Sequence, residues 1–176
     1  PVWEAIREVF PEIRLRGLKI GVGDHCYRYF LSPQKYFREH PDWFPLLGEG
    51  CELSMIRTGC NHVQFCLSHP DAKATFMRNV VEYLRGNPEI DYLSVWPNDF
   101  AGWCQCETCR ETPQPDQYLA LNNELAAALG SEGLSTRIFH FAYATHLDTP
   151  DFVQPSDDID ILFCTWGRDY SLSLSD

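Results

Sequence analysis

The stretch DYLSVWPNDFAGWCQCETC, residues 91–109, joins a predicted strand to a dense group of cysteines. Residues 91–97 form a short apolar run that is typical of a buried strand, and the polar pair Asn98-Asp99 follows it directly. The cysteines then come in a C-x-C-x-x-C pattern, at Cys104, Cys106 and Cys109. The stretch is therefore either a metal-binding cysteine loop that follows a strand, or one wall of an active site whose position the cysteines fix. The loop with Cys104, Cys106 and Cys109 is called the knuckle below.

Long helices are predicted on both sides of this strand. Residues 71–89 place apolar side chains on one helical face, with Asp71 as the expected N-cap and Gly86 and Pro88 as the stop. Residues 115–133 form a second long helix, and residues 2–10 and 32–40 form shorter ones, the latter with Ser32 as N-cap. Further strands are expected at 15–23, 62–68, 136–144 and 158–166.

Alternation of strands and helices predicts an α/β fold with a mostly parallel sheet. Four or five βα units are about half of an eight-fold barrel, so we expect a (β/α)8 TIM-type barrel or a partial barrel fragment. An open doubly wound sheet is the alternative. Residues 1–176 are expected to form one domain and to be a fragment of a longer chain, with a long insert loop at about 45–61.

Composition excludes several classes of partner. The chain of 176 residues has a net charge of −11, with 14 basic and 25 acidic residues and no basic run, so we expect no nucleic acid partner. No apolar stretch approaches the roughly 20 residues of a membrane span. No glycine-rich phosphate motif occurs, whereas aromatic residues reach 14%, which suits stacking on sugar rings.

In both candidate architectures, ligands bind where parallel strands end at their carboxyl termini. These positions carry the carboxylates, amides and aromatic rings that a sugar-binding cleft uses. They are Asp24 and His25; Cys66 and Ser68; Trp96, Asn98 and Asp99; Tyr143, Thr145 and His146; and Thr165, Trp166 and Arg168.

Each candidate has an alternative interpretation. Asp99, if partly desolvated, suits the protonation of a leaving oxygen, but Asn-Asp pairs also cap turns. His25 is a candidate substrate ligand or a structural histidine. Tyr143 and Trp166 are candidate stacking platforms or simply core residues. Asp24, Asp148 and Asp169 are candidates for a second carboxylate.

The cysteine pattern suits tetrahedral Zn²⁺, which needs a fourth ligand from elsewhere in the chain. Cys66, at a predicted strand end, is the first choice, and Cys60, His62 and His69 are alternatives. Disulfides in an oxidising compartment are the competing interpretation. A thiolate-rich site is mainly structural, so no cofactor is expected for catalysis. A thiol-redox domain is disfavoured because Pro113 and Pro115 follow Cys106 and Cys109 where a helix should run.

The order of these segments resembles a bacterial glycoside-hydrolase-like domain family, long catalogued as of unknown function. The resemblance rests on Asp24-His25, SPQKYFREHPDWF, QFCLSHPDA, LSVWPNDFAGWCQCETC and FHFAYATHLDTP, and covers about residues 18–166. The matching positions are His25, Cys66, Asn98, Asp99, Cys104, Cys106, Cys109 and Tyr143. The insert LLGEGCELSMIRTGCNH departs from the family pattern, which has a short turn there.

The resemblance implies a retaining-glycosidase barrel, distantly similar to α-glucuronidases and β-hexosaminidases, with some members like endo-β-N-acetylglucosaminidases. Such enzymes use the substrate's acetamide as nucleophile beside a carboxylate. The resemblance also favours an extracytoplasmic location. We therefore expect a glycoside hydrolase with Asp99 as a catalytic or substrate-orienting carboxylate and His25, Asn98, Tyr143 and Trp166 as sugar ligands. The alternative is a non-catalytic carbohydrate-binding or interaction domain with a structural zinc.

Overall fold

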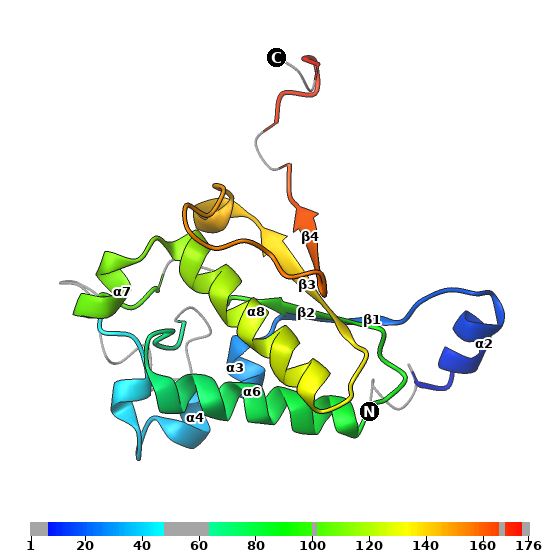
Figure 1. Ribbon diagram of the computed structural model, residues 1–176, viewed down its shortest axis with the longest axis horizontal. Helices are drawn as coiled ribbons and strands as arrows, with labels where there is room; N and C mark the ends of the chain where they lie inside the picture. Colours follow the sequence, from blue (N-terminus) through cyan, green and yellow to red (C-terminus); the bar gives the residue numbers. More distant parts are fainter. Residues whose placement is uncertain (1–6, 48–63, 100–101, 166–167, 174–176) are drawn as a thin grey trace.

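The computed structural model describes residues 7–47, 64–99, 102–165 and 168–173 (Figure 1). Four parallel strands within these residues form one sheet in the order β1-β2-β3-β4. They are β1 (Gly21–His25), β2 (Tyr92–Trp96), β3 (Arg137–Ala142) and β4 (Ile159–Phe163). Spatial order equals chain order, without the reversal that marks a doubly wound sheet. The described strands do not close into a barrel.

The helices connect and cover these strands. They are α2 (Phe10–Leu15), α3 (Tyr27–Phe30), α4 (Pro33–Tyr36), α6 (Pro70–Arg85), α7 (Glu107–Glu111) and α8 (Gln114–Ser131), with short 3₁₀ turns η1 (Pro41–Trp43) and η2 (Ala144–His146). Figure 1 shows the two long helices, α6 and α8, side by side. α8 also contacts β3 and β4.

The core lies between these two helices and one face of the sheet. Leu93, Val95, Ile138 and Ile159 alternate along their strands with half-buried residues and point into one hydrophobic cluster with the apolar stripes of α6 and α8. The opposite face, called the aromatic face below, carries half-buried rings at alternate positions. Its rings are Tyr92, Trp96, Phe139 and Phe141.

Gly23 permits the close approach of β1 to β2. Its φ of +108° belongs to the region that favours glycine, and a Cβ atom at this position would lie 2.3 Å from the carbonyl oxygen of Ser94. Any other residue would therefore both strain the backbone and push the two strands apart.

Two predicted strands differ from the structure. The strand expected at 15–23 begins only at Gly21, because residues 10–15 form α2. Residues 64–68 of the strand expected at 62–68 are irregular, and residues 62 and 63 lie outside the described part. Gln64 N–H instead donates to Gly102 O at 3.0 Å, and Cys66 N–H donates to Trp43 O at 2.8 Å. This segment is therefore held by loops and by no ladder of the sheet.

The long helices agree with prediction, but some ends differ. α6 begins at Pro70, and its N-cap is His69, whose Nδ1 accepts from Ala72 N–H at 3.4 Å; the expected cap Asp71 lies inside the first turn. The helix expected at 32–40 shortens to α4, and the Ser32 hydroxyl contacts Gln34 instead of capping the backbone. Most of the helix expected at 2–10 and most of the insert loop lie outside the described residues.

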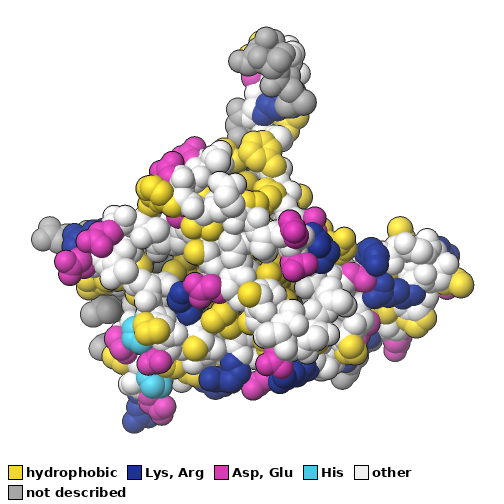
Figure 2. Space-filling model, in the orientation of Figure 1, with side chains coloured by type: hydrophobic (Ala, Val, Ile, Leu, Met, Phe, Trp, Pro, Cys, Tyr) yellow, Lys and Arg dark blue, Asp and Glu magenta, His cyan; other side chains and the backbone are white. Residues whose placement is uncertain are grey.

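The outer strand β4 exposes apolar side chains. Ile161 is 48% exposed, Leu162 43% and Phe163 61%. Figure 2 shows hydrophobic side chains gathered near the point where the chain leaves β4, and residues 168–173 project away from the sheet. Among the described helices, none combines the length and the apolar character required to cross a membrane.

Candidate functional site

Aromatic rings line the carboxyl edge of β1, β2 and β3. His25 ends β1 and pairs in register with Trp96 at the end of β2, with their ring centroids 5.7 Å apart. Trp96 stacks on Phe141 of β3 at 4.1 Å, and Phe141 stacks on Tyr143 at 4.9 Å. These contacts form a continuous aromatic surface next to the polar residues that end the strands.

His25 is oriented by the chain that follows β2. Its Nδ1 lies within hydrogen-bond distance of Pro97 O, and because a carbonyl only accepts, Nδ1 carries the proton. In the neutral ring, Nε2 therefore offers a lone pair. Nε2 lies 4.0 Å from a carboxylate oxygen of Asp99 and 4.0 Å from one of Asp24. The Nε2 atom thus lies near both carboxylates.

Asp99 lies at this edge and remains 53% exposed at its side chain. Burial, and then the negative charge of Asp99, raise the pKa of Tyr143 above its usual value. The carboxylate is therefore available to a ligand, although water reaches it.

Asn98 is buried beneath this edge, with 6% of its surface exposed. Its side-chain oxygen accepts from Arg28 N–H at 3.3 Å, and its backbone bonds to the side-chain amide of Gln64. Its position anchors the turn that presents Asp99. The predicted sugar contact of Asn98 stays a prediction, and Trp166 lies outside the described residues.

His146 is a polar residue of this edge that the sequence placed among the strand ends without a role of its own. It follows β3 in η2, is 7% exposed, and neither ring nitrogen has a hydrogen-bond partner within the described chain. Burial, and then the neighbouring His25, lower the pKa of His146 to about 4. The ring is therefore neutral at pH 7. Its only sequence signal was its place just after a predicted strand.

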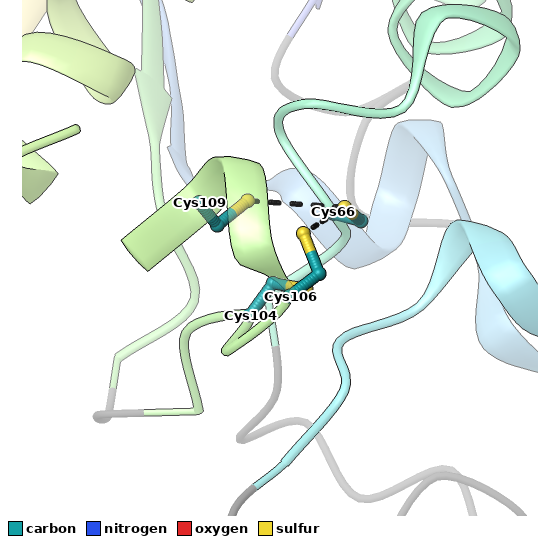
Figure 3. A group of neighbouring side chains, drawn as sticks. All are labelled: Cys66, Cys104, Cys106 and Cys109. Carbon is teal, nitrogen blue, oxygen red and sulfur yellow. Dashed lines mark hydrogen bonds between the residues drawn. The ribbon is translucent and has the colours of Figure 1, made fainter. Parts of the chain in front are cut away.

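The structure brings Cys66 together with the three cysteines of the knuckle (Figure 3). The four sulfur atoms lie within 4.8 Å of one another, and Cys66 Sγ is 3.9 Å from both Cys106 Sγ and Cys109 Sγ. These distances are far longer than the roughly 2.05 Å of a disulfide bond. All six described cysteines are free thiols, while Cys51 and Cys60 lie outside the described residues.

The spacing of the sulfurs fits one tetrahedral metal ion. Ligands about 2.3 Å from a tetrahedral Zn²⁺ lie about 3.8 Å from each other, close to the 3.9 Å found here. Hydrogen bonds from Cys104 and Cys109 lower the pKa of Cys66, so one sulfur of the cluster readily becomes a thiolate. The four residues can therefore hold a metal ion, and tetrahedral sulfur ligands favour zinc or iron.

Polar groups around the cluster support thiolate ligands. Ser68 Oγ lies 3.2–3.4 Å from three of the sulfurs, and Leu46 N–H donates to Cys104 Sγ at 3.3 Å. Such outer contacts orient metal ligands. The alternative ligand His69 is engaged elsewhere, since its Nε2 lies 2.9 Å from Asp42 and its Nδ1 caps α6. His62, another alternative, lies outside the described residues.

Comparisons with known proteins place the chain in a family without assigning an activity. No curated protein and no solved structure matches it. One family model matches residues 7–176, which is nearly the whole sequence. The chain therefore belongs to the family described as a domain of unknown function, DUF4838.

Proposed function

We propose that this chain forms part of a glycoside hydrolase barrel and that Asp99 is a carboxylate of its active site. The observation that carries the proposal is the grouping of Asp99, His25 and the Trp96–Phe141–Tyr143 stack at the carboxyl edge of parallel strands. Active sites of barrel enzymes lie at this edge, and aromatic rings beside carboxylates suit the apolar and hydroxylated faces of a sugar.

Three features of the sheet support a (β/α)8 barrel. The strands follow one another in chain order, as they do around a barrel. The long helices pack on one face, while the aromatic face holds the half-buried rings that a barrel interior would enclose. The outer strand β4 exposes apolar side chains that a further βα unit would cover.

The second carboxylate of the proposed site is Asp24. Its oxygen and that of Asp99 are both 4.0 Å from His25 Nε2, so these two oxygens are at most 8.0 Å apart. Retaining glycosidases hold their carboxyl groups about 5–5.5 Å apart and inverting ones about 6.5–9.5 Å; the first range lies below this limit and the second overlaps it. The other candidates fit less well, because Asp169 accepts from Ser171 in the projecting segment, and among the described residues Asp148 makes no ion pair with His25.

The reaction needs an acid that protonates the glycosidic oxygen and a base or nucleophile on the other side of the sugar. Asp99 and Asp24 would share these tasks, with His25 Nε2 near both. The retaining reaction through a substrate acetamide, on an N-acetylglucosaminide, is the form that the sequence resemblance favours, together with an extracytoplasmic location. Zinc in the four-cysteine centre would be structural, because all four ligand positions belong to the protein.

Turnover of aryl glycosides, with N-acetylglucosaminides first, tests this function on the longest natural chain that contains the domain. Asp99→Asn is expected to reduce kcat/KM by on the order of 10³ or more, because the amide can neither donate an acidic proton nor act as a base. Asp157→Asn, at an exposed carboxylate far along the chain from the site, serves as the matched control. Unchanged turnover in Asp99→Asn would exclude a catalytic role.

One observation favours the second candidate, a non-catalytic carbohydrate-binding domain with a structural zinc. Asp99 is 53% exposed and Asp24 is 75% exposed at the side chain, whereas an acid catalyst usually requires desolvation. This candidate predicts binding of oligosaccharides in calorimetry without release of the aryl group. It also predicts that Asp99→Asn weakens binding but leaves the metal content unchanged.

A further inference from the structure

The side chain of Gln64 forms two hydrogen bonds with the backbone of Asn98. Its Nε2 donates to Asn98 O at 2.7 Å, and its Oε1 accepts from Asn98 N–H at 2.8 Å. Gln64 is 1% exposed, so both bonds are shielded from water. The side-chain amide thus bonds to Asn98 as a neighbouring strand would, directly before Asp99.

The same segment reaches the cysteine centre two residues later. Cys66 contributes its sulfur to the four-cysteine cluster, and its N–H donates to Trp43 O. Gln64 N–H donates to Gly102 O, which lies between Asp99 and the knuckle. A short covalent and hydrogen-bonded path therefore runs from the Cys66 sulfur through Gln64 and Asn98 to Asp99.

We propose that Gln64 is a positioning residue for Asp99 and that it couples metal binding at the four cysteines to the placement of this carboxylate. The catalytic meaning of the coupling rests on the proposed function, but the coupling itself is a property of the fold. Residues 64–68 belong to no strand. Phe65 and Leu67 bury their side chains in the core, and the Cys66 sulfur is a further attachment of this segment. A bound ion fixes that attachment and thereby holds the Gln64 amide against Asn98.

Glutamine is suited to this contact because it provides one donor and one acceptor. Gln64→Leu removes both and leaves the buried N–H and C=O of Asn98 without these partners. Gln64→Glu keeps the acceptor for Asn98 N–H but faces Asn98 O with a second oxygen. The two variants therefore distinguish loss of the whole contact from loss of one half.

Amide hydrogen exchange of Asn98, followed by NMR with and without bound Zn²⁺, tests the coupling without any substrate. In the zinc-loaded protein, Gln64→Leu is expected to speed exchange of the Asn98 amide by about tenfold or more, the effect of one lost hydrogen bond. Removal of zinc from the wild-type protein by a chelator is expected to do the same, while the amides in the middle of α8 keep their protection.

Gln117→Leu is the matched control. The Gln117 amide bonds to Cys109 O and Thr112 O, so it touches the knuckle but not Asn98, and its loss is expected to leave Asn98 exchange unchanged. Equal Asn98 exchange in the zinc-loaded and zinc-free wild type would overturn the proposal. So would a chelator effect that exposes α8 and Asn98 equally, because the ion would then hold the whole fold without a path through Gln64.

These measurements distinguish a failure of the metal coupling from a failure of the proposed glycosidase function. The wild-type comparison needs no variant, so it decides the coupling even where Gln64→Leu does not fold, and Gln64→Glu provides the milder change. If Asn98 exchange follows the metal while Asp99→Asn leaves glycoside turnover unchanged, the coupling stands and the glycosidase role fails.

Discussion

Tyr118→Phe removes a hydroxyl that stands between β2 and β3. Tyr118 is fully buried, and its hydroxyl donates to Val95 O at 3.0 Å and accepts from Phe141 N–H at 3.1 Å. The β2–β3 pairing ends at Ser94 and Phe139. In a continued parallel ladder, Phe141 N–H would donate directly to Val95 O. The hydroxyl therefore replaces one ladder hydrogen bond just below the stacked rings of Trp96 and Phe141.

The expected loss in the free energy of unfolding follows from two backbone groups, Val95 O and Phe141 N–H, that lose their hydrogen-bond partner. An unsatisfied buried donor or acceptor costs about 1–3 kcal/mol. Val95 is completely buried and Phe141 is half-buried, so we expect Tyr118→Phe to reduce the free energy of unfolding by about 3 kcal/mol. For a domain of this size, that corresponds to a fall of roughly 6–12 °C in Tm.

Urea unfolding followed by tryptophan fluorescence measures this difference, with Tyr29→Phe as control because Tyr29 is 66% exposed. The control is expected to change stability by less than about 0.5 kcal/mol. A loss below about 1 kcal/mol in Tyr118→Phe would refute the reasoning. It would mean that the two strands close the gap and form the direct Phe141-to-Val95 bond without the hydroxyl.

Three further predictions concern the cysteine centre and two buried titratable groups. Cys66→Ser is expected to reduce bound zinc from about one ion per chain to a small fraction by elemental analysis, whereas Cys164→Ser, outside the cluster, keeps it. Burial alone would raise the pKa of Asp116, but the N–H groups of Phe152, Asp151 and Val153 outweigh burial and hold that pKa below its usual value. Because a carboxyl with a lowered folded pKa stabilises only while ionised, its contribution is lost as the pH falls below about 4. Asp116→Asn should therefore cost about 2–3 kcal/mol in urea unfolding at pH 7 and weaken the acid-dependent loss below pH 4, and an unchanged acid profile would contradict this. Burial, and then His146, lower the pKa of His140 to about 3, so the folded state favours the neutral ring and stability falls as the pH drops from about 6.5 toward 4. His140→Gln, which retains an acceptor for Asn122, should flatten the stability profile in this window, and a slope equal to that of the wild type would show that His140 does not titrate there.

The elements that the sequence predicted best are those with a regular apolar period. The helices expected at 71–89 and 115–133 and the strands expected at 91–97 and 136–144 all occur, because each buries a periodic set of side chains in one core. The strand expected at 158–166 also occurs, as β4, although Ile159 is its one buried residue. The grouping of Cys66 with the knuckle was also predicted correctly. The reason for that prediction, that Cys66 ends a strand of the sheet, is wrong, because residues 64–68 form no strand.

The sequence predictions that were wrong concern residues whose structure depends on tertiary contacts, and such contacts leave no local pattern in the sequence. Residues 64–68 have the composition of a strand, but Gln64 and Cys66 bond to loops instead of to the sheet. Asp71 is a favourable cap, yet the imidazole of His69 takes that role. Likewise, Asn98 looked like an accessible polar residue, and only the packing of Gln64 and Arg28 around it shows that it is an internal anchor.

Gly23 limits how this edge of the molecule can vary. With its φ of +108° and the Ser94 oxygen 2.3 Å from any Cβ, position 23 accepts glycine alone. Selection or design that seeks a new ligand preference therefore cannot act through this position. Diversity has to enter at other positions of this edge, such as Tyr143, and a saturation library should show an invariant residue at position 23.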